Sequence, residues 1–178
     1  MKPDLDKWLP EAQLRVKHTR KSSASTDQLW EAARSLPLAD TALLGRLVGW
    51  RIPGLDRGVT LDDLFRQPPF MVLEESDHAL VSGLVGRIWT LGRDYPRLSS
   101  PEQFRSWEQR GTARVVFAHW VQPSHDGRTA LGSEARVQAL GSQGRMGLAA
   151  VRPIVRAFSP LVGSDGLAAA VRRAENHR

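Results

Sequence analysis

The first candidate for a chemical role is His119, in the segment TARVVFAHWVQ (112–122). Strand-like alternation places His119 on one face with Val115, Phe117 and Val121, which are all apolar. An imidazole on such a face is either a hydrogen-bonded core residue or, with a second polar group within reach, a general acid/base. The pattern therefore marks His119 as a candidate for the interior of the fold.

Arg87 is the second candidate, in the segment ALVSGLVGRIWTL (79–91), where two glycines lie three residues apart. A phosphate-binding loop needs consecutive N–H groups that open a helix, but here no Lys-Ser/Thr pair follows and the next residues are strand-like. The segment instead predicts a central strand whose glycines allow a bend or a close approach. Arg87 then anchors a ligand carboxylate or phenolate, or pairs with Glu134 or Glu75 on the outer face.

Other kinds of chemical site have little support. The five histidines show no HExxH or HxxxH spacing, cysteine is absent, and there is no GxSxG elbow, so we expect no metal, no cofactor and no hydrolase triad. Glu74 and Glu75 are adjacent and therefore lie on opposite faces of a strand, which rules out a carboxylate pair. The basic and aromatic residues form no nucleic-acid-binding pattern.

Ligand sites in proteins are mostly apolar and aromatic, with a few placed polar groups. Seven residues meet this description as the candidate lining of a ligand cavity: Arg87, Trp89, Trp107, Phe117, His119, Trp120 and Met146.

These residues lie on a series of elements that the sequence pattern predicts. A half-buried strand over 12–20 is followed by two short helices, over 23–36 with Ser25 or Thr26 as N-cap, and over 39–50. A connection over 51–69 contains a helical turn, TLDDLF. Two hairpins follow, 70–91 with a turn at Asp77-His78, and 112–140 with an Asp-Gly turn.

The remainder, 142–176, has a helical period. Pro153 predicts a kink or a helix start, and Pro160 with GSDG (163–166) predicts a second interruption, after which Ser164 caps a last helix. From residue 142 to the C-terminus six arginines outnumber two acidic residues. This basic stretch suits either an interaction surface or an ordinary solvated helix face.

The segments WLPEAQLRVKHTR, LVSGLVGRIWTL and GSEARVQA, in this order and before a long final helix, resemble the START-like, or SRPBCC, superfamily. The chain is similar to polyketide cyclase/dehydrase-related bacterial members over residues 8–176. The resemblance implies an α+β helix-grip fold: a curved antiparallel sheet of about seven strands around a long, kinked C-terminal helix, with an apolar cavity between them.

From this resemblance we expect a hydrophobic small molecule, of the lipid, quinone or aromatic polyketide class, to bind in that cavity without chemistry. Two alternatives remain open. One is a cyclase or dehydratase that uses His119 or Arg87, and the other is an interaction protein that uses the basic C-terminal helix.

Length and composition limit the number of domains and the classes of protein to be considered. The 178 residues, 41% of them hydrophobic, suit one domain over 1–178 with a short polar lead at 1–10. The sequence contains no apolar run long enough to span a membrane and no secretory signal, so we expect a cytoplasmic protein that is not integral to a membrane. The net charge of +6 does not by itself imply nucleic-acid binding, and the oligomeric state is left open.

Overall fold

The computed structural model describes residues 1–41, 58–90, 92 and 95–176, with the backbone alone for 154–163. In this part of the chain, five antiparallel strands form one sheet in the order β1-β5-β4-β3-β2. The strands are β1 (Leu14–Ser22), β2 (Met71–Ser76), β3 (Ala79–Gly86), β4 (Ala113–Pro123) and β5 (Thr129–Ala139). The seven strands implied by the resemblance are not confirmed, whereas the antiparallel α+β class is.

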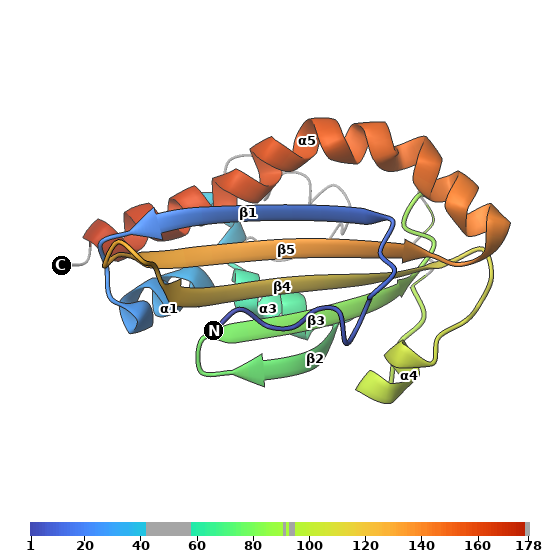
Figure 1. Cartoon of the computed structure of the whole chain (residues 1–178), viewed down its shortest axis with the longest axis horizontal. Helices are drawn as coiled ribbons and strands as arrows, with labels where there is room; N and C mark the ends of the chain where they lie inside the picture. The colour runs from blue at the N-terminus through green and yellow to red at the C-terminus, as the bar shows by residue number, and fades with distance from the viewer. Residues whose placement is uncertain (42–57, 91, 93–94, 177–178) are drawn as a thin grey trace.

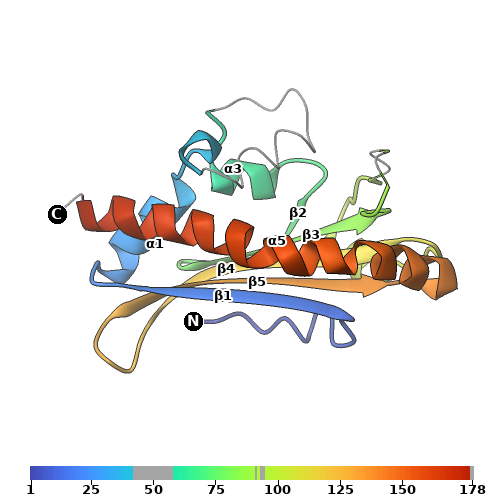
Figure 2. The same ribbon diagram turned by 90° about the horizontal axis from the view of Figure 1, so that it is seen from above.

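The helical elements are α1 (Thr26–Arg34), the 3₁₀ turn η1 (Leu38–Asp40), α3 (Leu61–Arg66), α4 (Pro101–Arg105) and α5 (Gly141–Asn176). Figure 2 shows α1, α3 and α5 on one face of the sheet and the N-terminal segment on the other. We call these the inner and the outer face. The arrangement is consistent with a helix-grip architecture, in which a long C-terminal helix crosses an antiparallel sheet (Figure 1).

Local sequence signals predict most of these elements. The β2–β3 turn falls at Asp77-His78, and Ser25 caps α1 by accepting a hydrogen bond from the Gln28 N–H. TLDDLF forms α3, which Thr60 caps in the same way. Of the helix expected over 39–50, residues 42–50 lie outside the described part. Among the described residues, no helix has both the length and the apolar character needed to cross a membrane.

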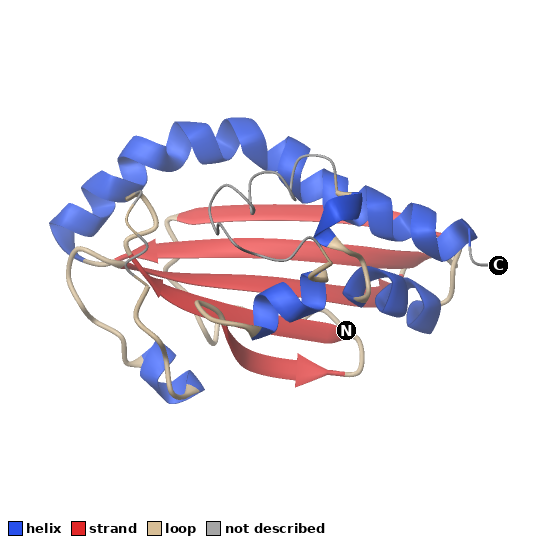
Figure 3. Cartoon of the chain, turned by 180° about the vertical axis from the view of Figure 1, so that it is seen from behind, coloured by secondary structure: helices blue, strands red, loops and turns tan. Residues whose placement is uncertain are grey.

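The C-terminal helix differs from the expectation. Its backbone is assigned as one helix of 36 residues through Pro153, Pro160 and the GSDG segment, so Ser164 does not begin a separate helix. A helix of that length spans about 54 Å. The longest strands have 11 residues, or about 37 Å. The helix is therefore longer than any strand of the sheet, and Figure 3 shows it bowed.

Two separate apolar clusters hold α5 on the inner face. Near its N-terminal end, Leu148 packs with Leu14, Leu84, Val115 and Val137. Near its C-terminal end, Leu167 and three alanines of α5 pack against α1 and the other end of the sheet, including Leu80, Val121 and Leu131. The helix is thus fixed at both ends.

The outer face is closed by the N-terminal segment and α4. The lead at 1–10 is more than a polar extension, because Leu5, Trp8 and Leu9 are buried against the outer side of β3 and β4. Phe104 of α4 completes this cluster and is fully buried. With one cluster on each face, every residue of β3 is buried, as the apolar character of both its faces predicts.

An ion cluster with a buried centre, Arg136 and Glu134, ties the N-terminal segment to β5. Arg136, 4% exposed, donates from Nε to Glu134 Oε1 at 2.7 Å and from Nη1 to Asp6 Oδ1 at 2.6 Å. Lys2 Nζ lies 3.1 Å from the second oxygen of Glu134. The Arg136 guanidinium lowers the pKa of Asp6 by hydrogen bonding and charge, and with Lys2 it lowers the pKa of Glu134 despite burial. Arg136 and Glu134 keep all of these charged partners only while the N-terminal segment stays packed on the sheet.

Two glycines on the outer face make room for large side chains. A Cβ on Gly83 would lie 2.7 Å from Leu73 Cδ1 and 2.8 Å from the Phe104 ring. A Cβ on Gly132 would overlap the indole of Trp120, its cross-strand neighbour. Gly83, in the segment 79–91, therefore allows close packing within a sheet. This agrees with the prediction of a strand glycine in place of a phosphate-binding loop.

We expect Arg136→Met to lower the free energy of unfolding by about 3–5 kcal/mol, because it leaves the Glu134 carboxylate buried with Lys2 as its remaining charge partner. The double variant Glu134→Leu/Arg136→Met should recover at least half of this loss. Urea unfolding of the three proteins at pH 7 measures both effects. A single variant as stable as the wild type would contradict the role of the cluster.

We expect Gly132→Ala to cost about 1–3 kcal/mol of stability, because the added methyl displaces the buried Trp120 ring. The matched control is Gly92→Ala, since a Cβ at Gly92 meets no atom closer than 4.0 Å. Thermal or urea unfolding should separate the two variants, and equal stabilities would show that Trp120 moves aside at no cost.

Candidate functional site

Half-buried side chains lie in the middle of the inner face. We call this set the inner-face patch; it consists of Val16 and His18 on β1, Ser133 and Ala135 on β5, and Phe117 and His119 on β4. Residues on the same face at both ends of these strands are buried, Val115 and Val121 on β4 for example. The patch therefore keeps accessible surface on a face that α5 otherwise covers.

Strand register orders the patch into two rows. His18 and His119 both pair with Ser133, from opposite sides, so a polar row runs His18, Ser133, His119 across three strands. The adjacent row is apolar, because Val16 and Phe117 both pair with Ala135. Neighbouring strands lie about 4.8 Å apart, which places the two histidines about 10 Å from each other.

Aromatic rings gather at one side of the patch. Phe65 of α3 contacts His119 with ring centroids 4.7 Å apart, Phe117 at 5.4 Å and Phe70 at 5.1 Å. Phe70 and Phe117 meet edge to face at 5.7 Å. The short helix α3 thereby places an aromatic wall over His119, and we call Phe65, Phe70, Phe117 and His119 the aromatic cluster.

His119 is neutral at physiological pH. Enclosure by the surrounding rings and strands lowers its pKa from 6.5 to about 4, because burial disfavours the imidazolium, although the nearby Asp62 carboxylate favours it. A neutral imidazole offers one donor and one acceptor. At pH 7 His119 can therefore accept a proton or share a hydrogen bond, but it supplies no positive charge.

Two buried oxygens near the aromatic cluster have no hydrogen-bond partner, and within the described residues only one other buried side-chain atom shares this property. The first is the hydroxyl of Ser82, 1% exposed, on the inner side of β3 and opposite Phe117 in the register. The second is Oδ1 of Asp62, whose other oxygen accepts from Arg66 Nε at 2.7 Å. Buried polar atoms are nearly always paired, so both point to a missing partner.

Of the seven residues that the sequence singles out, the structure brings two together in the patch, Phe117 and His119. Trp89 packs at the end of the same face, against Gly147 in the second turn of α5. Met146, also on α5, is 72% exposed and points away from the sheet.

The remaining three lie elsewhere. Trp120 is on the outer face of β4 beside Gly132, and Trp107 packs with the outer cluster and donates to Thr112 Oγ1 at 3.0 Å. Neither lines the space between sheet and helix. Arg87 follows the last residue of β3 and is exposed. The carboxylates considered as its partners are held by other cations, Glu75 by Arg66 and Glu134 by Arg136 and Lys2.

Arg87 and His119 do not share a site. His119 pairs with Leu80, seven residues before Arg87, which corresponds to about 20 Å along an extended strand. The adjacent glutamates separate as the period of two predicts: Glu74 pairs with Lys7 on the outer side, and Glu75 with Arg66 of α3 on the inner side.

The sequence reading did not include His18, Ser133, Ser82 or Asp62 among the candidate residues. A signal existed for His18, because its alternation with Leu14 and Val16 puts it on the buried face of its strand. For Asp62 and Phe65 no local signal existed, since their position over the sheet depends on how the connection folds back.

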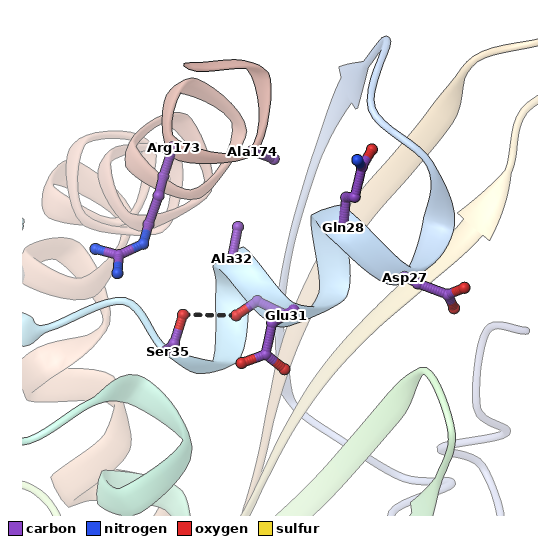
Figure 4. A pocket seen from close by; sticks show the side chains of 7 residues that line it. All are labelled: Asp27, Gln28, Glu31, Ala32, Ser35, Arg173 and Ala174. Carbon is purple, nitrogen blue, oxygen red and sulfur yellow. Dashed lines mark hydrogen bonds between the residues drawn. The ribbon is translucent and has the colours of Figure 1, made fainter. Parts of the chain in front are cut away.

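A hollow lies between α1 and the end of α5, away from the inner-face patch, and it has a volume of about 470 Å³. Figure 4 shows its lining: Ala32 and Ala174 at the helix contact, with Asp27, Gln28, Glu31, Ser35 and Arg173 around them. The Ser35 hydroxyl donates to the Glu31 carbonyl at 2.8 Å, which closes the end of α1. The polar side chains that line the hollow cap helix ends or form surface ion pairs. The hollow is open to solvent.

No known protein-family model matches the chain, and no curated protein matches it in sequence. Several solved structures align with it at low identity, among them the following three. One from Thermus thermophilus covers 92% of this chain and 99% of its own (8% identity, TM-score 0.38). A hypothetical protein from Helicobacter pylori covers 91% and 90% (12% identity, TM-score 0.40). The Zhui aromatase/cyclase from Streptomyces sp. R1128 covers 91% and 93% (18% identity, TM-score 0.35).

Proposed function

We propose that the protein binds a hydrophobic small molecule on the inner-face patch, between the sheet and α5. The observation that carries the proposal is the half-buried middle of a face whose two ends are buried. Apolar and aromatic side chains that remain accessible beneath a covering helix lose surface to water only when something else occupies that space. Phe117 and Ala135 form the apolar floor, with the polar row beside them.

The polar groups of the patch suit orientation of a ligand better than catalysis. His119 is neutral, and Arg87, the other residue considered for a cyclase reaction, lies about 20 Å from it along β3 and β4. The ring wall over His119 provides flat apolar surface for a planar or aromatic body. We therefore favour binding, with a lipid, quinone or aromatic polyketide as the ligand class, over a reaction that needs both residues.

We expect Ala135→Trp to abolish ligand binding without unfolding the protein, because the indole fills accessible space on the floor of the patch. Thr19→Trp is the matched control, since Thr19 is exposed on the opposite side of β1. The measurement is a thermal-shift screen of fatty acids, sterols, quinones and aromatic polyketides, with native mass spectrometry of the purified protein to detect copurified ligand. Absence of any ligand in both assays, or equal binding by both variants, would refute the proposal.

The neutral state of His119 predicts a pH dependence of stability. Its pKa is about 4 in the folded chain and near 6.5 when unfolded, so between these values the unfolded chain binds more protons. Stability should thus fall as pH falls from 7 to 5, with a contribution from His119 on the order of 1–2 kcal/mol. Asp6, Glu75, Asp126 and Glu134 also have lowered pKa values, but they protonate mainly below this window.

His119→Gln removes this contribution, whereas His125→Gln, in the exposed turn between β4 and β5, should retain it. Urea unfolding of both variants and the wild type at pH 7 and pH 5 gives the comparison. If the loss of stability between the two pH values is the same in all three proteins, the imidazole is not held neutral by burial.

A further inference from the structure

We propose that the ligand carries an uncharged hydroxyl or N–H group that donates a hydrogen bond to Asp62 Oδ1, and that the Asp62 carboxylate excludes ligands with an anionic head. This inference rests on the proposed function, because it specifies which molecules the inner-face patch accepts. It assigns Asp62 the role of a specificity residue at the edge of the aromatic cluster.

The geometry of α3 places Asp62 beside the patch. Asp62 and Phe65 are three residues apart on this helix and therefore share a side of it. Phe65 contacts both Phe117 and His119, and the Asp62 charge acts on His119. The carboxylate is thus close to the rings that would hold the body of a ligand.

The hydrogen bonding of Asp62 is incomplete. Arg66 Nε satisfies Oδ2 at 2.7 Å, and the two Nη groups of Arg66 are directed to Glu75, one of them at 2.9 Å. Oδ1 is buried and has no donor among the residues that the structure describes. A buried carboxylate oxygen without a donor costs free energy, which a donor on a bound molecule would recover.

A second unpaired group lies on the inner face of β3. Ser82 is fully buried, its hydroxyl has no partner, and it lies opposite Phe117, which contacts Phe65. A hydroxyl can serve as donor or acceptor, so it would suit the same small polar group of a ligand.

The charges around the aromatic cluster disfavour an anion. Arg66, the cation on the same helix, is engaged by Asp62 and Glu75 together. His119 adds no positive charge at pH 7. A carboxylate head in this position would meet the Asp62 charge at short range, and Arg66, the described cation beside Asp62, is already engaged by two carboxylates, so the contact is unfavourable in a poorly solvated site.

The test compares three probes of similar shape by isothermal titration at pH 7. 2-Naphthol offers a neutral O–H donor, 2-methoxynaphthalene lacks the donor, and 2-naphthoate is an anion. We expect 2-naphthol to bind at least about tenfold more tightly than 2-methoxynaphthalene, as for a hydrogen bond to a charged acceptor. 2-Naphthoate should bind more weakly than either.

Asp62→Asn should reduce the preference for 2-naphthol over 2-methoxynaphthalene to below about threefold and should strengthen 2-naphthoate binding, because it removes the charge but keeps the shape. Asp77→Asn, an exposed aspartate in the β2–β3 turn, should change neither. Equal affinities for 2-naphthol and 2-methoxynaphthalene, or no effect of Asp62→Asn, would overturn the role of Asp62 and leave the proposed binding function intact. If none of the three probes binds and the ligand screen is also negative, the proposed function itself fails.

Discussion

The structure depends on the way α5 is held against the inner face of the sheet. The helix is longer than any strand, and it is packed at both of its ends into separate apolar clusters. Removing either cluster would release one end of the helix and expose the strands that it covers. Between the ends of the strands, the inner-face side chains of β1, β5 and β4 stay half-buried, and these form the inner-face patch.

The outer face has the opposite character. The N-terminal segment buries three large apolar side chains there, and the ion cluster of Arg136, Glu134, Asp6 and Lys2 adds directional contacts that a purely apolar strap would lack. Trp120 and Phe104 fill this face so closely that only glycine fits opposite them. A well-packed outer face leaves the inner face as the side of the sheet on which a ligand can be held.

Burial determines the chemical properties of the polar residues in and beside the patch. Burial makes His119 a neutral hydrogen-bonding group, and it leaves Asp62 Oδ1 and the Ser82 hydroxyl without partners. Aromatic rings from α3, β4 and the residue before β2 pack together with the His119 imidazole. Such a combination, apolar surface with a few unpaired polar atoms, favours recognition of an uncharged polar head on a hydrophobic body.

The sequence by itself determined the elements whose signals are local. Alternation of period two predicted the strands and the burial of both faces of β3, a capping residue predicted α1, and adjacency separated Glu74 from Glu75. It also placed His119 and Phe117 on one face of β4.

Only the tertiary structure decided which element covers that face of β4, because period two specifies that two faces exist and not which element covers each. For this reason Trp120 lies outside the patch, whereas Asp62 and Phe65 enter it from a helix that folds back over the sheet. The continuity of the α5 backbone through Pro153 and Pro160 was likewise absent from the local signals, because each proline removes a helical hydrogen-bond donor and predicts an interruption.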